Sequence, residues 1–135
     1  MEIGCTMLCG LDDNALKGVL AHELAHIKKR HTIKISLLSI ILLIPMIVCV
    51  FLARSWSEIT IFLTFALMVI VWIFLYSSIS WHNEYEADAV ASEYVGKQTI
   101  SHALTQAAGL INRHGDTLTH PSFKKRISHL PSDKE

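Results

Sequence analysis

Two long stretches without a charged side chain constrain this chain more than any other feature. Residues 35–53 read ISLLSIILLIPMIVCVFLA, and residues 59–81 read ITIFLTFALMVIVWIFLYSSISW. At about 1.5 Å of rise per residue, helices of these lengths would span roughly 28 and 34 Å, close to the thickness of the hydrocarbon core of a bilayer. Because only the segment RSWSE separates them, the pattern predicts a mainly α membrane protein in which 35–53 and 59–81 are transmembrane helices that form a hairpin.

The composition agrees with a small membrane protein. Of the 135 residues, 51% are hydrophobic, and 12 basic side chains balance 12 acidic ones. A formal net charge of zero gives no field that would attract nucleic acid, so we expect no nucleic-acid partner. The alternative is a helical hairpin buried inside a soluble protein, but too few residues remain to cover two helices that are apolar on all sides.

Basic residues near the ends of the apolar runs predict the orientation. Four of them precede the first run: Lys28, Lys29, Arg30 and Lys34. The turn between the runs has only Arg54, beside Glu58. Loops rich in Lys and Arg stay in the cytoplasm, so both chain ends are expected there. Without a signal peptide, the sequence favours an integral protein of a prokaryotic plasma membrane in which everything outside the hairpin, including any chemistry, lies on the cytoplasmic face.

A segment before the first apolar run has the pattern of a zinc site. It reads VLAHELAHIKKRH over residues 19–31. On a helix, His22 and His26 project from one face, one turn apart, so both rings can reach one tetrahedral zinc ion. Glu23 lies beside them, where its carboxylate can act as a general base toward a water at the metal. The alternative is a pair of buried histidines satisfied by hydrogen bonds.

A third ligand is expected just after the second apolar run, in NEYEADAVASEYV at residues 83–95. Its apolar helical face consists of Ala87, Ala91 and Val95. Glu84 and Asp88 lie in the middle of that face, whereas Glu86 and Glu93 project the opposite way. Glu84 is therefore the predicted third zinc ligand, and Asp88 would accept the free ring N–H of a ligating histidine. Carboxylates that are solvated or paired with lysines are the alternative.

The remaining segments predict shorter elements. Residues 2–11, EIGCTMLCGL, indicate a short N-terminal strand. Asp12 or Asp13 is expected to cap a helix that runs to about His31. The outer strip of this helix would consist of Asn14, Lys17, Gly18 and Lys28. Further helices are expected over 82–95, closed by Gly96, over 99–114, closed by Gly115, and from Pro121 to Leu130.

Three motifs, in this order, resemble those of the HtpX-type membrane zinc metallopeptidases, which are related to the CAAX prenyl proteases. They are LAHELAHIKKRH, NEYEAD and THPSFKKRISHL, and the resemblance extends from Gly10 to Leu130. It implies a single metallopeptidase domain over 1–135. In that domain, a gluzincin-like pair of zinc helices has the transmembrane hairpin inserted between the histidine helix and the glutamate helix.

The resemblance also implies roles for individual residues. It implies one Zn²⁺ per chain, with His22, His26 and Glu84 as ligands and Glu23 as the catalytic base. His120 is expected to point at the site and to stabilise the oxyanion, and Arg126 to pair with Asp88. The other histidines are expected to be surface residues: His31, His82, His102, His114 and His129.

The leading functional hypothesis is a zinc-dependent endopeptidase that cleaves misfolded or membrane proteins at the cytoplasmic face, in protein quality control under stress. Its partners would be polypeptide substrates and the lipid bilayer. Family members usually carry further N-terminal membrane helices and a β-hairpin before the zinc helix, whereas about ten residues precede it here, which predicts an N-terminally shortened form. A catalytically inactive zinc-binding membrane adaptor is therefore the alternative. A hairpin with a purely structural role would leave Glu84 and Asp88 unexplained.

Overall fold

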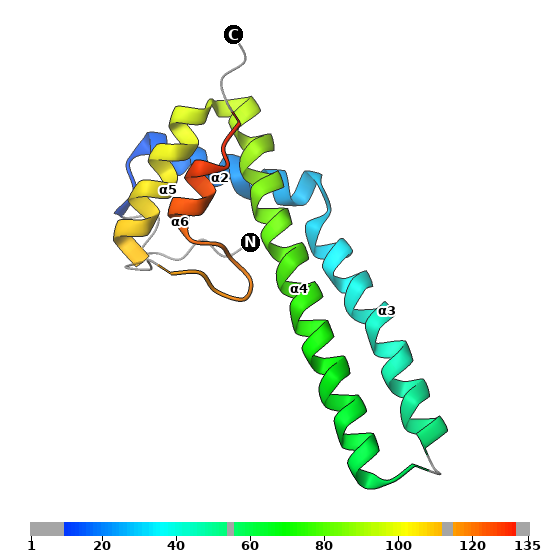
Figure 1. Ribbon diagram of the computed structural model, residues 1–135. Coiled ribbons are helices and arrows are strands. Elements are labelled where there is room, and N and C mark those ends of the chain that lie inside the picture. Colours follow the sequence, from blue (N-terminus) through cyan, green and yellow to red (C-terminus); the bar gives the residue numbers. More distant parts are fainter. Residues whose placement is uncertain (1–9, 54–55, 112–114, 132–135) are drawn as a thin grey trace.

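The computed structural model describes residues 10–53, 56–111 and 115–131. Its helices are α2 (Asp13–Lys28), α3 (His31–Leu52), α4 (Glu58–Val95), α5 (Lys97–Ile111) and α6 (Phe123–Ser128). Helix α3 runs beside the first part of α4 as a two-helix rod, and α2, α5 and α6 gather around the other end of α4 (Figure 1). These described ranges contain no strand, and the strand expected over 2–11 falls almost entirely outside them.

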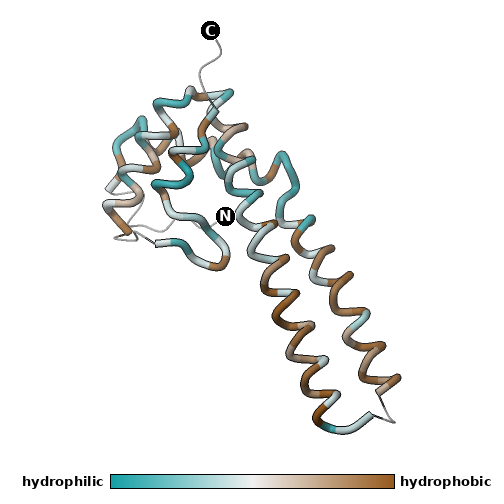
Figure 2. The backbone as a smooth tube through the Cα atoms, in the orientation of Figure 1, coloured by the Kyte–Doolittle hydropathy of each residue, from teal (hydrophilic) through white to brown (hydrophobic). Residues whose placement is uncertain are grey.

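Helices α3 and α4 form the predicted hairpin, and both are long and apolar enough to cross a membrane. The second helix does not stop at Trp81 but continues without a break to Val95. The separate helix expected over 82–95 is therefore the end of α4, because no glycine or proline interrupts the chain before Gly96. At 1.5 Å per residue, its 38 residues extend about 57 Å, more than a bilayer core requires. Figure 2 shows that α4 is hydrophobic in the half that lies beside α3 and more hydrophilic toward the end that lies beside α2.

Helix α2 begins as expected and ends early. Asp12 caps it, and its carboxylate accepts a hydrogen bond from the Ala15 backbone N–H at 2.7 Å. The helix ends at Lys28 instead of His31, because Arg30 adopts a left-handed conformation with φ 55°. The chain turns at this residue, and His31 becomes the first residue of α3.

Helix α2 packs closely on α5, and this contact removes Gly18 from the predicted outer strip. Gly18 is buried, and a Cβ atom built on it would lie 2.7 Å from the Ala103 Cβ atom. Asn14, Lys17 and Lys28 are exposed as predicted, but the outward side of α2 is also apolar. It exposes Leu20, Leu24 and Ile27, with exposed fractions of 40%, 59% and 64%. The core on the inner side is formed by Ala91, Ile100, Leu104, Ala107, Phe123 and Leu130.

The C-terminal segment folds back onto α4. The Ser80 hydroxyl donates to the Thr119 carbonyl at 2.7 Å, and the Trp81 indole N–H donates to the Thr117 carbonyl at 2.9 Å. Helix α6 is shorter than expected at both ends, because its N-cap is Ser122, in extended conformation, and Pro121 lies before the helix. Helix α5 ends at Ile111, and its expected end at 112–114 lies outside the described residues.

Candidate metal centre

The predicted zinc ligands come together where α2 crosses α4. The Nε2 atoms of His22 and His26 are 3.0 Å apart. Glu84 Oε2 lies 3.6 Å from His22 Nε2, and Glu84 Oε1 lies 3.5 Å from His26 Nε2. Ligand atoms about 2.0–2.2 Å from a tetrahedral ion are roughly 3.3 Å from one another. Two imidazoles and one carboxylate at this spacing therefore fit a zinc ion with one position left for water or substrate.

Small side chains allow the two helices to approach. Ala87 and Ala91 on α4 are 0% exposed, and Ala25 on α2 is 3% exposed. These residues fall at helical spacing beside the ligands, as the sequence pattern predicted for α4. Since no long side chain separates the backbones at this crossing, Glu84 can reach the space between the two imidazole rings.

The first histidine is held by a buried ion pair. His22 Nδ1 lies 2.8 Å from Asp88 Oδ1, and the Arg126 guanidinium donates two hydrogen bonds of 2.7 Å to the Asp88 carboxylate. Arg126 Nη1 also lies 2.8 Å from Glu84 Oε2. Burial alone would raise the pKa of Asp88, but the hydrogen bonds from Arg126 and His22 outweigh it and lower that pKa below its ordinary value.

The second histidine is held by residues that the sequence interpretation placed elsewhere. His31 was expected on the surface, yet it is 2% exposed, and its Nδ1 atom lies 2.8 Å from His26 Nδ1. His31 Nε2 lies 3.1 Å from Glu86 Oε2, so Glu86 reaches the centre through His31 instead of projecting away from it. The sequence signal for this position of His31 was weak, because Arg30 is neither glycine nor asparagine and no residue marked the end of α2.

Lysine side chains fix the charge of Glu86. The Lys29 ammonium lies 2.9 Å from Glu86 Oε1, and the Lys34 ammonium lies 3.3 Å from Glu86 Oε2. The hydrogen bond from Lys29 is the main cause that lowers the pKa of Glu86 to about 2. Burial lowers the pKa of His31. Glu86 is thus an ionised acceptor near neutral pH, next to a buried imidazole.

His120 lies at the edge of the centre, as the motif resemblance implied. Its Nε2 atom is 3.6 Å from Glu84 Oε1, and its Nδ1 atom is 2.7 Å from the Thr119 hydroxyl oxygen. Its side chain is 43% exposed, so the ring is accessible from solvent. The other histidines lie away from the ligands: His82 is exposed, His102 bonds Asp12, and His129 stacks on Tyr85. His114 lies outside the described residues.

The ligands line a cavity of about 440 Å³. Its polar lining comprises His22, Glu23, His26, Thr32, Glu84, Asp88, His120 and Arg126. Its apolar wall includes Val19, Ile100, Leu104, Ile111 and Phe123. A metal site, a carboxylate beside it and an apolar wall therefore share one open space, as the hydrolysis of a peptide bond requires.

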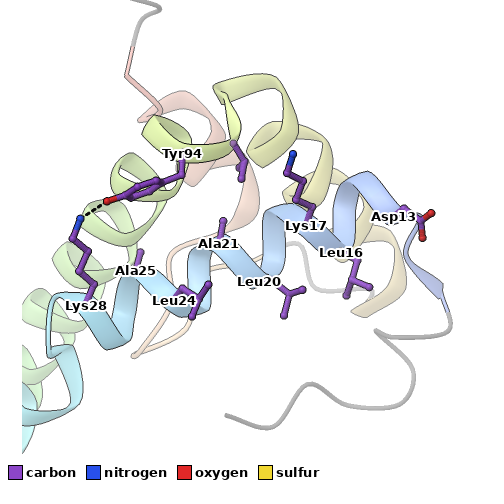
Figure 3. Close-up of a pocket in the computed structure, with 10 residues that line it drawn as sticks. Asp13, Leu16, Lys17, Leu20, Ala21, Leu24, Ala25, Lys28 and Tyr94 are labelled. Atoms are coloured by element: carbon purple, nitrogen blue, oxygen red, sulfur yellow. Dashed lines mark hydrogen bonds between the residues drawn. The ribbon is translucent and has the colours of Figure 1, made fainter.

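A second and larger hollow, of about 570 Å³, lies on the outer side of α2. Leu16, Leu20 and Leu24 line it, with Lys28 and Tyr94 at its rim (Figure 3). Asp13 is its one acidic lining residue, and it has no histidine or cysteine among its described lining. The hollow lacks a metal-ligating cluster, so the chemistry lies on the inner side of α2.

One protein family matches nearly the whole chain, including the residues of this centre. The model of peptidase family M48 matches residues 4–134. No curated protein and no solved structure matches the chain. The matched range contains both zinc-site helices, the hairpin between them and the C-terminal segment that covers them.

Proposed function

The chain belongs to peptidase family M48, a family of zinc metallopeptidases that hydrolyse peptide bonds, and from this premise we propose that it is an endopeptidase of misfolded and membrane proteins at a cytoplasmic membrane surface. One observation carries the proposal. The ligand atoms of His22, His26 and Glu84 lie within 4.8 Å of one another, and Glu23 lines the same cavity.

The proposed chemistry assigns a separate task to each polar residue. His22, His26 and Glu84 hold the metal. Zinc, when bound, polarises the substrate carbonyl and acidifies the attacking water. Glu23 takes up the proton of that water and passes it to the leaving amine, because its carboxylate borders the cavity without belonging to the ligand set.

His120 is the proposed donor to the oxyanion. Its ring is accessible at the edge of the cavity, and the contact with the Thr119 hydroxyl restricts the ring orientation. A donor in this position stabilises negative charge that develops on the carbonyl oxygen only as the water attacks. Asp88 and Arg126 act through their neighbours, since Asp88 orients His22 and Arg126 offsets the two buried carboxylates.

The hairpin supports action at a membrane. The most apolar window of each helix is 0% buried, so the side chains of these windows need an apolar surrounding. Members of the family are generally membrane proteins. Glu84 follows the second apolar run by only three residues, which supports a metal centre near the point where α4 would leave the bilayer. Substrates with a segment in or near the membrane would meet the centre there.

The test compares metal content with cleavage. The full chain is purified in detergent, its bound zinc is measured, and cleavage of an unfolded polypeptide is compared for the wild type, Glu23→Gln and Glu93→Gln. Glu93 is an exposed glutamate on α4 and serves as the matched control. We expect one zinc per chain in all three proteins and loss of cleavage, by a factor of roughly 100 or more, in Glu23→Gln alone.

Other results would decide against the proposal. If all three proteins, including the wild type, bound zinc and none cleaved the substrate, the inactive zinc-binding adaptor would be favoured. A wild-type protein without zinc would exclude both the peptidase and the adaptor.

A further inference from the structure

His26 is joined to Glu86 by a line of polar contacts through His31. The two Nδ1 atoms of His26 and His31 are 2.8 Å apart, and His31 Nε2 lies 3.1 Å from Glu86 Oε2. His31 is 2% exposed, so water does not compete for these contacts. The line ends at an acceptor that Lys29 and Lys34 hold in place.

The positions of the ring protons follow from the metal site. A neutral imidazole carries one ring proton, so a histidine that binds a metal through Nε2 carries its proton on Nδ1. His26 Nδ1 must then donate, and His31 Nδ1 must accept. This leaves the proton of His31 on Nε2, where it faces the Glu86 carboxylate. Every contact in the line therefore has one donor and one acceptor, and each ring is fixed in one tautomer.

We propose that His31 is a positioning residue of the metal centre, which fixes the ring orientation and tautomer of His26 and transmits the anchoring effect of Glu86 to it. The inference rests on the proposed zinc-binding role of His26. Asp88 holds His22 by direct contact, whereas the carboxylate that supports His26 lies one imidazole further away. Both histidines are then oriented by a carboxylate, as ligating imidazoles commonly are.

The turn at Arg30 makes this arrangement possible. His31 follows His26 by five positions, a spacing that would put their rings on different faces of a continuous helix. The left-handed Arg30 ends α2 and returns His31 beneath His26. Because His31 is the first residue of α3 and Glu86 belongs to α4, the second ligand is oriented by both helices of the hairpin.

The test measures zinc affinity in the full chain in detergent, by competition with a chelator. His31→Asn keeps an acceptor near the Nδ1 position, whereas His31→Leu fills a similar volume without one. His102→Leu, which removes the imidazole that bonds Asp12 at the other end of α2, is the matched control. We expect zinc affinity to fall about 10- to 100-fold in His31→Leu. The affinity of His102→Leu should stay within about threefold of the wild type, and that of His31→Asn, which keeps the acceptor but loses the contact with Glu86, should fall less than that of His31→Leu.

Cobalt substitution and a second position complete the test. The visible spectrum of the Co²⁺ protein reports ligand geometry, and it should change in His31→Leu but not in His31→Asn. Glu86→Leu acts at the far end of the line and should lower zinc affinity about 3- to 10-fold; it decides the question if His31→Leu does not fold. Equal affinities in His31→Asn and His31→Leu, or an unchanged affinity in Glu86→Leu, would overturn the inference. A wild-type protein without zinc would refute the proposed function itself.

Discussion

At the scale of single residues, Arg126 connects the two buried carboxylates of the centre. It is 5% exposed and lies against Asp88, which is 2% exposed, and Glu84, which is 6% exposed. Two carboxylates on one apolar helix face would repel each other and lose their hydration. Arg126 therefore determines whether α4 can carry its two acidic residues toward α2 before any metal binds.

Replacement of this arginine gives the first prediction. Arg126→Leu leaves both carboxylates buried without their cation, so the free energy of unfolding of the zinc-free protein should fall by about 3–5 kcal/mol. Excess zinc should restore part of the loss, because Glu84 regains a cationic partner. Thermal unfolding in detergent, with and without zinc, measures both effects.

The control for Arg126→Leu is Lys125→Leu. Lys125 pairs with Asp116 at the surface, where ion pairs contribute little, so this variant should unfold nearly as the wild type does. Similar unfolding temperatures for Arg126→Leu and Lys125→Leu would contradict a structural role for the buried pair.

The residues of the centre differ in how far the sequence could predict them. Helical periodicity alone predicted that His22 and His26 share one face of α2 and that Glu84 and Asp88 share one face of α4. The structure places these two faces against each other. His31 could not be predicted in the same way. Its position depends on the left-handed turn at Arg30. This conformation is rare for arginine, so the sequence does not predict it.

At the scale of secondary structure, α4 is a single rigid connection between the apolar hairpin and the metal centre. The sequence predicted its two parts from a change in polarity near Trp81, and polarity marks where a helix leaves an apolar surrounding but not where it ends. The helix ends only at its C-cap Gly96, which has φ 87°. Glu84 therefore lies on the same continuous helix as the apolar segment.

The close packing of Gly18 on α2 against α5 leads to a second prediction about stability. In Gly18→Ala the new Cβ would lie 2.7 Å from the Ala103 Cβ atom and 3.0 Å from the Thr99 carbonyl oxygen, so the two helices must separate. Overpacking costs about 1–3 kcal/mol, more than the roughly 1 kcal/mol that alanine gains over glycine in a helix. We therefore expect a net loss of stability, measured as the free energy of unfolding.

Gly109→Ala is the matched control on α5. A Cβ atom at Gly109 meets nothing within 4 Å, so only the helix propensity applies, and the variant should be up to about 1 kcal/mol more stable than the wild type. The prediction lies in the opposite signs of the two changes. If Gly18→Ala were also stabilising, α2 and α5 would not pack as closely as described.

At the scale of the whole molecule, the apolar surface and the metal centre lie in different parts of the chain. The exposed apolar side chains are concentrated on α3 and the first part of α4, with a smaller group on α2, and Figure 2 shows the high hydropathy of the two hairpin helices. The polar lining of the centre faces inward, among α2, α4 and α6. The family match covers both parts, so we expect the hairpin and the centre to act as one unit.

The topology of this unit gives the last prediction. The basic residues before α3 favour a cytoplasmic location for both chain ends, which puts the turn at Ser57 outside and the C-terminal segment at Ser128 inside. Single-cysteine variants Ser57→Cys and Ser128→Cys, made after replacement of Cys5, Cys9 and Cys49 by serine, test this with a membrane-impermeant maleimide. Both positions are exposed, so accessibility in permeabilised cells is the common control.

In intact cells, we expect labelling of Ser57→Cys and protection of Ser128→Cys. Helix α6, which ends at Ser128, packs against the end of α4 that carries Glu84 (Figure 1), so the label at Ser128 also reports the side of the metal centre. The reverse labelling pattern would place the centre outside the cytoplasm. Substrates would then have to be exported proteins, although the zinc ligands and the roles proposed for Glu23 and His31 would be unaffected, because these depend on contacts within the chain.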